Sequence, residues 1–213
     1  MAHYFTNEEL KSEERIINCK INDFDFKFIT DNGVFSKSGL DFGTRSLLEN
    51  LDIDNINGDI LDFGCGYGPI GIYISKVKNT CVDMIDVNER SVKLSIKNAE
   101  LNKVNINAFV SDIYSNVNKK YDFIISNPPI RVGKEILYKI LFDAKNYLKN
   151  NGEMWIVVNK DQGAKSLMKD LEKSYTVNLV KKNKGFYIIN CKTNWQIDLV
   201  LIKSYIGCMY LFL

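Results

Sequence analysis

The sequence predicts an α/β fold with a largely parallel sheet, helices on both of its faces, an antiparallel C-terminal hairpin and an N-terminal β-hairpin. Between residues 59 and 173, short apolar runs alternate with amphipathic segments, which is the order that produces parallel strands joined by helices. Residues 175–181 and 186–191 are separated by a link too short for such a crossover. The last two strands must therefore pair antiparallel.

The N-terminal part predicts a hairpin followed by a helix. Residues 24–30 alternate apolar and polar side chains, and residues 31–33 supply a turn before a second run at 34–36. Residues 44–51 have the pattern of a helix, and Thr44 is suited to be its N-cap.

The remaining elements follow from the period of the apolar residues. Buried strands are predicted at 59–63, 81–86, 105–110, 121–126, 152–158, 175–181 and 186–191. Helices are predicted at 69–76, 88–102, 134–148 and 161–173. Residues 183–185 have the chemistry of a tight turn between the last two strands.

The chain divides into a polar, irregular segment at 1–23, one domain at 24–192 and an apolar tail at 193–213. The longest uncharged run of the tail is its last ten residues, which is too short to span a bilayer. We expect the tail to pack on the domain or at a contact between two copies, which makes a homodimer possible.

The composition excludes several classes of protein. With 213 residues, 46% of them hydrophobic and 25% charged, the chain has the make-up of one globular domain. Its single histidine, His3, argues against histidine-based catalysis and against a multi-histidine metal site. The five cysteines form no C-x-x-C pair, so we expect reduced thiols in a cytoplasmic protein and no metal. A net charge of +2 neither indicates nor excludes a nucleic-acid partner.

A glycine cluster follows the strand predicted at 59–63. Residues 62–71 read Asp-Phe-Gly-Cys-Gly-Tyr-Gly-Pro-Ile-Gly, and glycines at a strand–helix junction let a ligand approach the backbone closely. The spacing of Gly66, Gly68 and Gly71 also matches the dinucleotide fingerprint, which is weak when it stands alone. An acid at the strand end, followed by three alternating glycines, resembles the first motif of class I S-adenosylmethionine (SAM) methyltransferases. The ammonium group of that ligand suits Asp62 better than a pyrophosphate would.

Two further acids end predicted strands. Asp86 can accept both ribose hydroxyls of either cofactor, and it can also cap the following helix. Asp112 follows the third strand and can accept from an adenine amino group. The residues expected to bind the cofactor are Asp62, Gly64, Cys65, Gly66, Gly68, Asp86, Val87, Asp112 and Asn127.

Asn127, Pro128 and Pro129 follow the fourth strand and are the expected catalytic residues. Pro128 restricts Asn127 to an extended conformation, and the prolines stiffen the loop. The Asn127 side-chain carbonyl and a backbone carbonyl can then accept from both hydrogens of an exocyclic amino group. The lone pair of the amino nitrogen would then point at a sulfonium methyl. Catalysis would come mainly from this positioning, and no strong base would be required.

This motif is typical of amino-group methyltransferases acting on bases or glutamine amides, where an aromatic residue usually follows the prolines. Ile130 stands in its place here, which removes a stacking partner worth roughly 1–3 kcal/mol. The departure bears on the identity of the acceptor more than on the type of reaction.

Several segments together resemble the methyltransferase small domain of RsmC-like ribosomal RNA guanine-N2 methyltransferases. Besides the glycine cluster they are Gly33-Val34-Phe35-Ser36, Leu40-Asp41 with Gly43-Thr44, Ile85-Asp86-Val87-Asn88, Asn127-Pro128-Pro129-Ile130-Arg131 with Gly133-Lys134, and Lys184-Gly185-Phe186-Tyr187. The resemblance covers about residues 24–192. It implies a Rossmann-like sheet of seven strands, SAM as methyl donor and a guanine of small-subunit ribosomal RNA as acceptor.

The resemblance also implies that Phe35-Ser36 and Asp41 with Gly43 lie near the cofactor and acceptor pocket. Ile130 can form an apolar wall against the acceptor. Arg131, Lys134 and the cluster of Lys181, Lys182 and Lys184 are candidate RNA contacts, or equally a solvated face. Longer members carry a second domain that assists substrate binding, and residues 1–213 contain none. Methylation of a protein glutamine or a small molecule, a SAM-binding module that needs a partner, and an NAD oxidoreductase stay open as alternatives.

Overall fold

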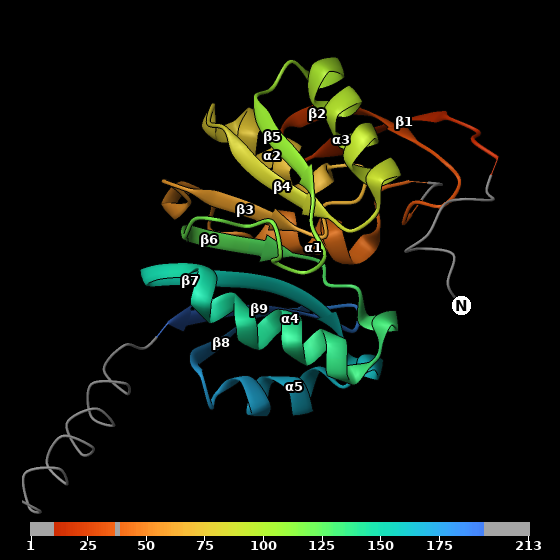
Figure 1. Ribbon diagram of the computed structural model, residues 1–213. Helices are drawn as coiled ribbons and strands as arrows, with labels where there is room; N and C mark the ends of the chain where they lie inside the picture. Colours follow the sequence, from red (N-terminus) through yellow and green to blue (C-terminus); the bar gives the residue numbers. More distant parts are fainter. Residues whose placement is uncertain (1–10, 37–38, 194–213) are drawn as a thin grey trace, which may run out of the picture.

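The computed structural model describes residues 11–36 and 39–193, and their centre is one seven-stranded sheet. Its strand order is β5-β4-β3-β6-β7-β9-β8, with β3 to β7 parallel and β9 antiparallel to both of its neighbours. The predicted fold class is therefore confirmed (Figure 1). The strands are β3 (Ile60–Phe63), β4 (Val82–Asp86), β5 (Ile106–Val110), β6 (Tyr121–Ser126), β7 (Leu148–Asn159), β8 (Tyr175–Asn183) and β9 (Phe186–Thr193).

Helices cover both faces of the sheet because successive strand residues point to opposite sides. On β6, for example, Ile125 packs with the residues of α1, α2 and α3, whereas its neighbour Ile124 packs with those of α4 and α5. The helices are α1 (Phe42–Asn50), η1 (Ile53–Asn55), α2 (Pro69–Lys78), α3 (Glu89–Asn102), η2 (Ile130–Val132), α4 (Lys134–Tyr147), η3 (Lys160–Gln162) and α5 (Ala164–Leu171).

The N-terminal hairpin exists and its predicted strand at 24–30 is confirmed as β2, but the predicted partner at 34–36 is wrong. Strand β1 (Arg15–Ile21) pairs antiparallel with β2 (Phe24–Thr30), so part of the segment expected to be irregular is a strand. Residues 31–36 contain turns and bends instead of the second strand. The reason is Asp31, which is buried and accepts hydrogen bonds from the Ser12 hydroxyl (2.8 Å) and the Glu13 backbone N–H (2.6 Å). These bonds hold the chain before β1 against the end of β2.

Helix α3 fastens this hairpin to the sheet. The Asn98 side chain accepts from Ile29 N–H (2.6 Å) and donates to Ile29 C=O (2.9 Å), and it also donates to the backbone carbonyl of Tyr67 (2.8 Å). Asn102 pairs with both backbone groups of Lys27 in the same way. The two side-chain amides thus supply hydrogen-bond partners for backbone N–H and C=O groups on the edge of β2 that does not pair with β1.

Two helices also differ from the sequence prediction. Helix α1 begins at Phe42 because Asp41, not Thr44, is its N-cap and accepts from Thr44 N–H (2.9 Å). The helix predicted at 161–173 is divided into η3 and α5 by Gly163, whose φ is 83°. The tail at 194–213 lies outside the described residues.

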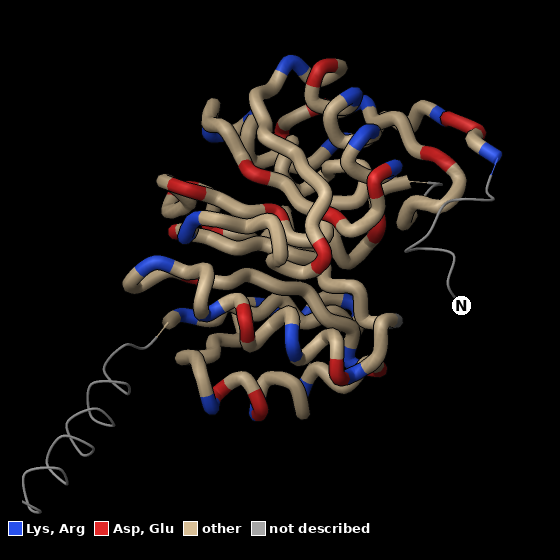
Figure 2. The backbone as a smooth tube through the Cα atoms, in the orientation of Figure 1, with Lys and Arg blue, Asp and Glu red and all other residues tan. Residues whose placement is uncertain are grey.

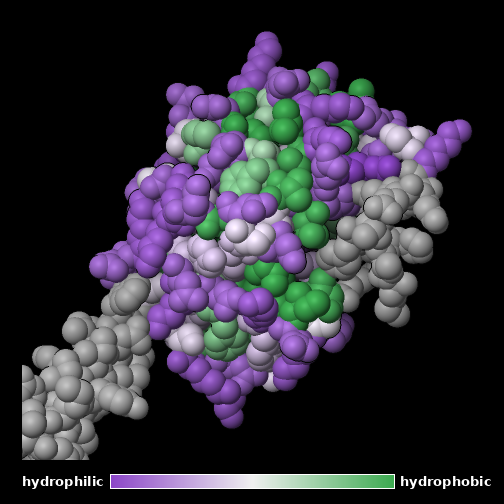
Figure 3. Space-filling view, viewed as in Figure 1, coloured by the Kyte–Doolittle hydropathy of each residue, from purple (hydrophilic) through white to green (hydrophobic). Residues whose placement is uncertain are grey.

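In the view of Figure 3 the surface is mostly hydrophilic, with hydrophobic side chains grouped over β5 and beside the start of α4. None of the helices in the described ranges is long and apolar enough to cross a membrane.

Candidate active site

Three loops meet at the carboxyl ends of β3, β4 and β6, the edge where parallel sheets bind ligands. The loop after β3 is tied to β4, since the backbone N–H groups of Gly64 (2.8 Å) and Cys65 (2.9 Å) both donate to the carbonyl of Ile85. The loop after β6 lies against it, because a Cβ atom on Gly64 would stand 4.0 Å from Pro129 Cδ. The glycine cluster and the Asn-Pro-Pro motif are therefore neighbours.

The glycines of the cluster serve two purposes. A Cβ on Gly68 would lie 2.8 Å from Ile72, and one on Gly71 would lie 2.6 Å from the Met84 sulfur, so these two allow α2 to pack on the sheet. Gly66 has φ of 56° and open space where its Cβ would be. Its backbone is thus free to face a ligand at close range.

Asp62 is a buried carboxyl beneath this loop. Its Oδ2 accepts from the Gly71 backbone N–H (2.8 Å), while its Oδ1 has no hydrogen-bond partner among the described residues. Burial raises the pKa of Asp62 to about 7 although the Gly71 hydrogen bond opposes the rise, and the nearby Asp86 charge adds to it. An unpaired buried acceptor is costly, and it calls for a donor or a cation that only a ligand or water can supply.

Asp86 joins the glycine loop to the start of α3. Its Oδ2 accepts from Gly66 N–H (2.9 Å) and its Oδ1 from Asn88 N–H (2.8 Å), and burial raises the pKa of the carboxyl. Each carboxylate oxygen can accept a second hydrogen bond, so the group retains capacity for two hydroxyls of a ribose. The helix cap itself is Asn88, which accepts from Arg90 N–H (2.9 Å).

The Asn127 side chain is held by two residues that lie far from it in the sequence. Its side-chain Nδ2 donates to Asp41 Oδ2 (3.1 Å) and to Thr44 Oγ1 (2.9 Å), both at the start of α1. Its Oδ1 has no partner among the residues that the structure describes. Sequence reasoning placed Asp41 near the pocket but missed this contact, since no local pattern links residues 86 positions apart.

An aromatic pair also lies beside these residues and was missed. The rings of Phe42 and Phe186 stand 5.5 Å apart, and a Cβ on Gly43 would be 2.8 Å from Phe186 and 2.9 Å from the Asp41 carboxylate. The glycine at position 43 therefore lets the Phe186 ring and the Asp41 carboxylate come close together.

The other expected cofactor residues lie around the same edge. Val87 is 38% exposed directly after β4, and Asp112 is exposed two residues after the end of β5. The Cys65 side chain is buried, and burial raises the pKa of its thiol far above the usual value, which argues against a nucleophile. Only its backbone is available to a ligand.

The expected acceptor residues divide into two groups. Phe35 is 52% exposed and Ser36 adopts a left-handed φ of 58°, both in the bends before α1. Ile130 packs against the cluster formed by α4 and α5, Arg131 belongs to η2, and the Lys134 ammonium lies 4.9 Å from the centre of the Tyr138 ring.

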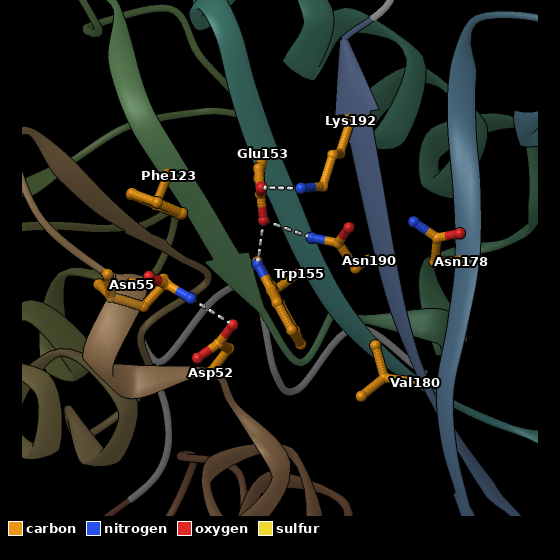
Figure 4. Close-up of a pocket in the computed structure, with 10 residues that line it drawn as sticks. Asp52, Asn55, Phe123, Glu153, Trp155, Asn178, Val180, Asn190 and Lys192 are labelled. Carbon is orange, nitrogen blue, oxygen red and sulfur yellow. Dashed lines mark hydrogen bonds and ion pairs between the residues drawn. The ribbon is translucent and has the colours of Figure 1, made fainter.

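A separate cavity of about 320 Å³ opens on the face of β6, β7, β9 and β8 that α1 leaves uncovered (Figure 4). Glu153 is one of its lining residues and accepts from Trp155 Nε1 (3.0 Å), Asn190 Nδ2 (2.7 Å) and the Lys192 ammonium (2.6 Å). Glu153 pairs in register with Phe123 near the start of β6, at the opposite end of that strand from Asn127. This cavity is therefore distinct from the candidate site.

Comparison with known proteins gives this geometry a context. A family model described as the methyltransferase small domain matches residues 25–190. The Bacillus subtilis protein YbxB is 43% identical over 196 residues, covering 89% of this chain and 98% of YbxB. Ribosomal RNA small subunit methyltransferase C of Vibrio parahaemolyticus is 41% identical over 132 residues, covering 60% of this chain and 38% of that protein.

Among solved structures, the T. thermophilus 16S rRNA N2 G1207 methyltransferase (RsmC), in complex with AdoMet and guanosine, has a TM-score of 0.77 at 23% identity. The match covers 87% of this chain and 52% of that one, and it shows a common fold. The chain thus spans about half or less of these two ribosomal RNA methyltransferases and nearly all of YbxB. Since the family model covers most of its length, the chain belongs to the methyltransferase small domain family.

Proposed function

We propose that the chain transfers a methyl group from SAM to an exocyclic amino group, and that the acceptor is guanine N2 in small-subunit ribosomal RNA. The observation that carries the proposal is Asn127, whose side-chain Oδ1 lacks a partner among the described residues in a loop that adjoins the glycine loop. An amide carbonyl in that place can accept from an amino group beside the methyl donor.

The cofactor is SAM, and the described residues fit it. The unpartnered Asp62 Oδ1 would accept from the ammonium of its methionine part, directly or through one water molecule. The loop of Gly64 and Gly66, open at Gly66, would face its chain, and Asp86 would accept from the ribose hydroxyls. Asp112 would accept from the adenine amino group, and Cys65, Gly68 and Val87 would contribute backbone contacts.

Catalysis in this proposal is mainly positioning. Bound SAM supplies a sulfonium carbon that is already electrophilic. Asn127 Oδ1 and the backbone carbonyl of Pro128 would each accept a hydrogen bond from one amino hydrogen, which would leave the nitrogen lone pair free to meet that carbon. As the new N–C bond forms, the S–C bond breaks, and the product nitrogen then loses a proton to water. Well-aligned reactants of this kind gain up to about 7–11 kcal/mol without a strong base.

The RNA acceptor rests on three supports. The named relatives that match over part of their length are ribosomal RNA methyltransferases. The Phe42–Phe186 pair lies next to Asp41 and offers the stacking surface that Ile130 does not. Lys184 lies 5.4 Å from the centre of the Phe42 ring, where it can meet a phosphate.

The first test is a labelled-methyl assay on undermethylated small subunits, whole RNA and protein, with Asn127→Ala as the comparison. We expect wild type to label the subunit RNA, and Asn127→Ala to bind SAM normally by calorimetry while its transfer rate falls at least about 100-fold. A wild-type rate in Asn127→Ala would exclude this mechanism. Label in protein alone would favour the glutamine alternative, and SAM binding without any transfer would favour a partner-dependent module.

A further inference from the structure

The most specific contact in the candidate site is the pair of hydrogen bonds that hold the Asn127 amide. Nδ2 donates to Asp41 Oδ2 at 3.1 Å and to Thr44 Oγ1 at 2.9 Å, so both of its hydrogens are used. Thr44 is 4% exposed, and Asp41 and Asn127 are half-buried, which reduces competition from water.

The chemistry of Asp41 fixes which end of the amide faces it. An ionised carboxylate only accepts hydrogen bonds, so the atom of Asn127 nearest to it must be the NH2 group. A hydroxyl such as that of Thr44 can donate or accept and would tolerate either orientation. Asp41 therefore decides the orientation, and Thr44 takes the second hydrogen.

Asp41 is itself held in place. Its Oδ2 also accepts from the Thr44 backbone N–H (2.9 Å) as the N-cap of α1, where the helix dipole favours a negative charge. Gly43 leaves the space that this carboxylate occupies, since a Cβ there would stand 2.9 Å from Oδ2. The Thr44 N–H and the space at Gly43 thus fix the position of Asp41 Oδ2, the oxygen that contacts Asn127.

We propose that Asp41 and Thr44 are positioning residues that keep the Asn127 carbonyl turned toward the acceptor amine. This inference rests on the proposed function. If the amide rotated by half a turn, its NH2 would face the amine of the acceptor, so one hydrogen bond would be lost and two donors would oppose each other. The rate of transfer would fall, whereas the binding of SAM would not change.

The test compares Thr44→Val, which keeps the shape but removes the acceptor, with Thr44→Ser, which retains the hydroxyl. Asp41→Ala and Asp41→Asn form the second pair, since Asn can still present an oxygen to both donors. We expect kcat to fall about 10–100-fold in Asp41→Ala, which removes the group that sets the orientation, and by a smaller factor of about 3–10 in Thr44→Val, which removes only the second acceptor; the conservative variants should recover most of each loss. KM for the acceptor and Kd for SAM should change less than about threefold.

Ser46→Ala is the matched control. Ser46 is a buried hydroxyl on the same helix, and it accepts from Asn183 Nδ2 (3.0 Å). Its loss should lower stability about as much as that of Thr44 without changing kcat. A merely structural role for Thr44 would instead give Thr44→Val and Ser46→Ala the same kinetics.

A second measurement is independent of methyl transfer. Hydrogen exchange of the Asn127 side-chain NH2, followed by NMR, should be slow in wild type and faster in Thr44→Val and Asp41→Ala. Rapid exchange in wild type, or unchanged kcat in both variants, would overturn the inference. Slow exchange in a wild-type protein that methylates no acceptor would instead reject the proposed function and leave the held amide intact.

Discussion

Asp62 is the residue with the least favourable environment in the candidate site. It is fully buried, and one of its oxygens has no partner among the described residues. Its pKa is raised from 3.8 to about 7, so the folded chain holds a proton on Asp62 between these pH values and the unfolded chain does not. Because the folded state binds this proton more tightly, the free energy of unfolding is higher at low pH and falls as the pH rises toward about 7.

Asp62→Asn should therefore stabilise the ligand-free protein at pH 8 and have little effect near pH 4. A pKa change of even one unit corresponds to about 1.4 kcal/mol, or about 3–6 °C in Tm for a chain of this length. Thermal melts at the two pH values measure this difference. The same variant should bind SAM at least about tenfold more weakly by calorimetry, because the cofactor's ammonium loses its counter-charge. Lower stability at pH 8 with unchanged SAM binding would contradict this role.

The sequence predicts this group of residues well because the motifs are local. Asp62, Asp86 and Asn127 lie at or next to the last residue of β3, β4 and β6, and parallel strands bring their carboxyl ends to one edge. The contact of Asp41 with Asn127 depends on how α1 lies across the sheet, which no spacing in the sequence encodes. The aromatic pair of Phe42 and Phe186 was missed for the same reason.

At the scale of elements, the N-terminal hairpin is the part that sequence patterns describe worst. Its turn uses Asn22 with φ of 49° rather than a glycine, so the usual turn signal is absent. The stronger turn signal at 31–33 instead marks the end of β2, where Asp31 binds the chain that enters β1. Tertiary hydrogen bonds from α3, not local propensity, fix where β2 lies.

Asn98→Ala should cost about 2–4 kcal/mol of unfolding free energy, because it removes three hydrogen bonds and leaves both backbone groups of Ile29 without their partner. Urea unfolding followed by circular dichroism measures the change. Glu100→Ala, an exposed position on the same helix, should stay within about 0.5 kcal/mol of wild type. Equal effects of the two substitutions would mean that the amide contacts do not stabilise the hairpin.

Across the whole molecule, charge is distributed without a single basic face in the view of Figure 2, where lysines, arginines and acids alternate along the chain. Lys182 and Lys184 nevertheless lie at the candidate site's edge, because β9 runs antiparallel to β7 and the β8–β9 turn returns there. Their ammonium groups stand 5.1 Å and 5.4 Å from the rings of Tyr187 and Phe42. RNA affinity would then depend on a local group of lysines, not on net charge.

Replacing Lys182 and Lys184 together with Glu should raise KM for the small subunit at least about tenfold and lower the salt dependence of binding by about one unit per lysine. Filter binding over a range of salt concentrations measures both. The double change of Lys169 and Lys173 to Glu alters the net charge equally at the end of α5 and just beyond it, and should leave KM within about twofold. If both pairs behave alike, the effect is one of net charge and the β8–β9 turn is not an RNA contact.

The most direct test of the central proposal is mass spectrometry of nucleosides from small-subunit RNA incubated with the chain and SAM that carries a deuterated methyl group. We expect deuterated N2-methylguanosine with wild type and none with Asn127→Ala, although both proteins bind SAM. Label in another nucleoside, label only in protein, or no label with wild type on undermethylated subunits would contradict guanine N2 methylation.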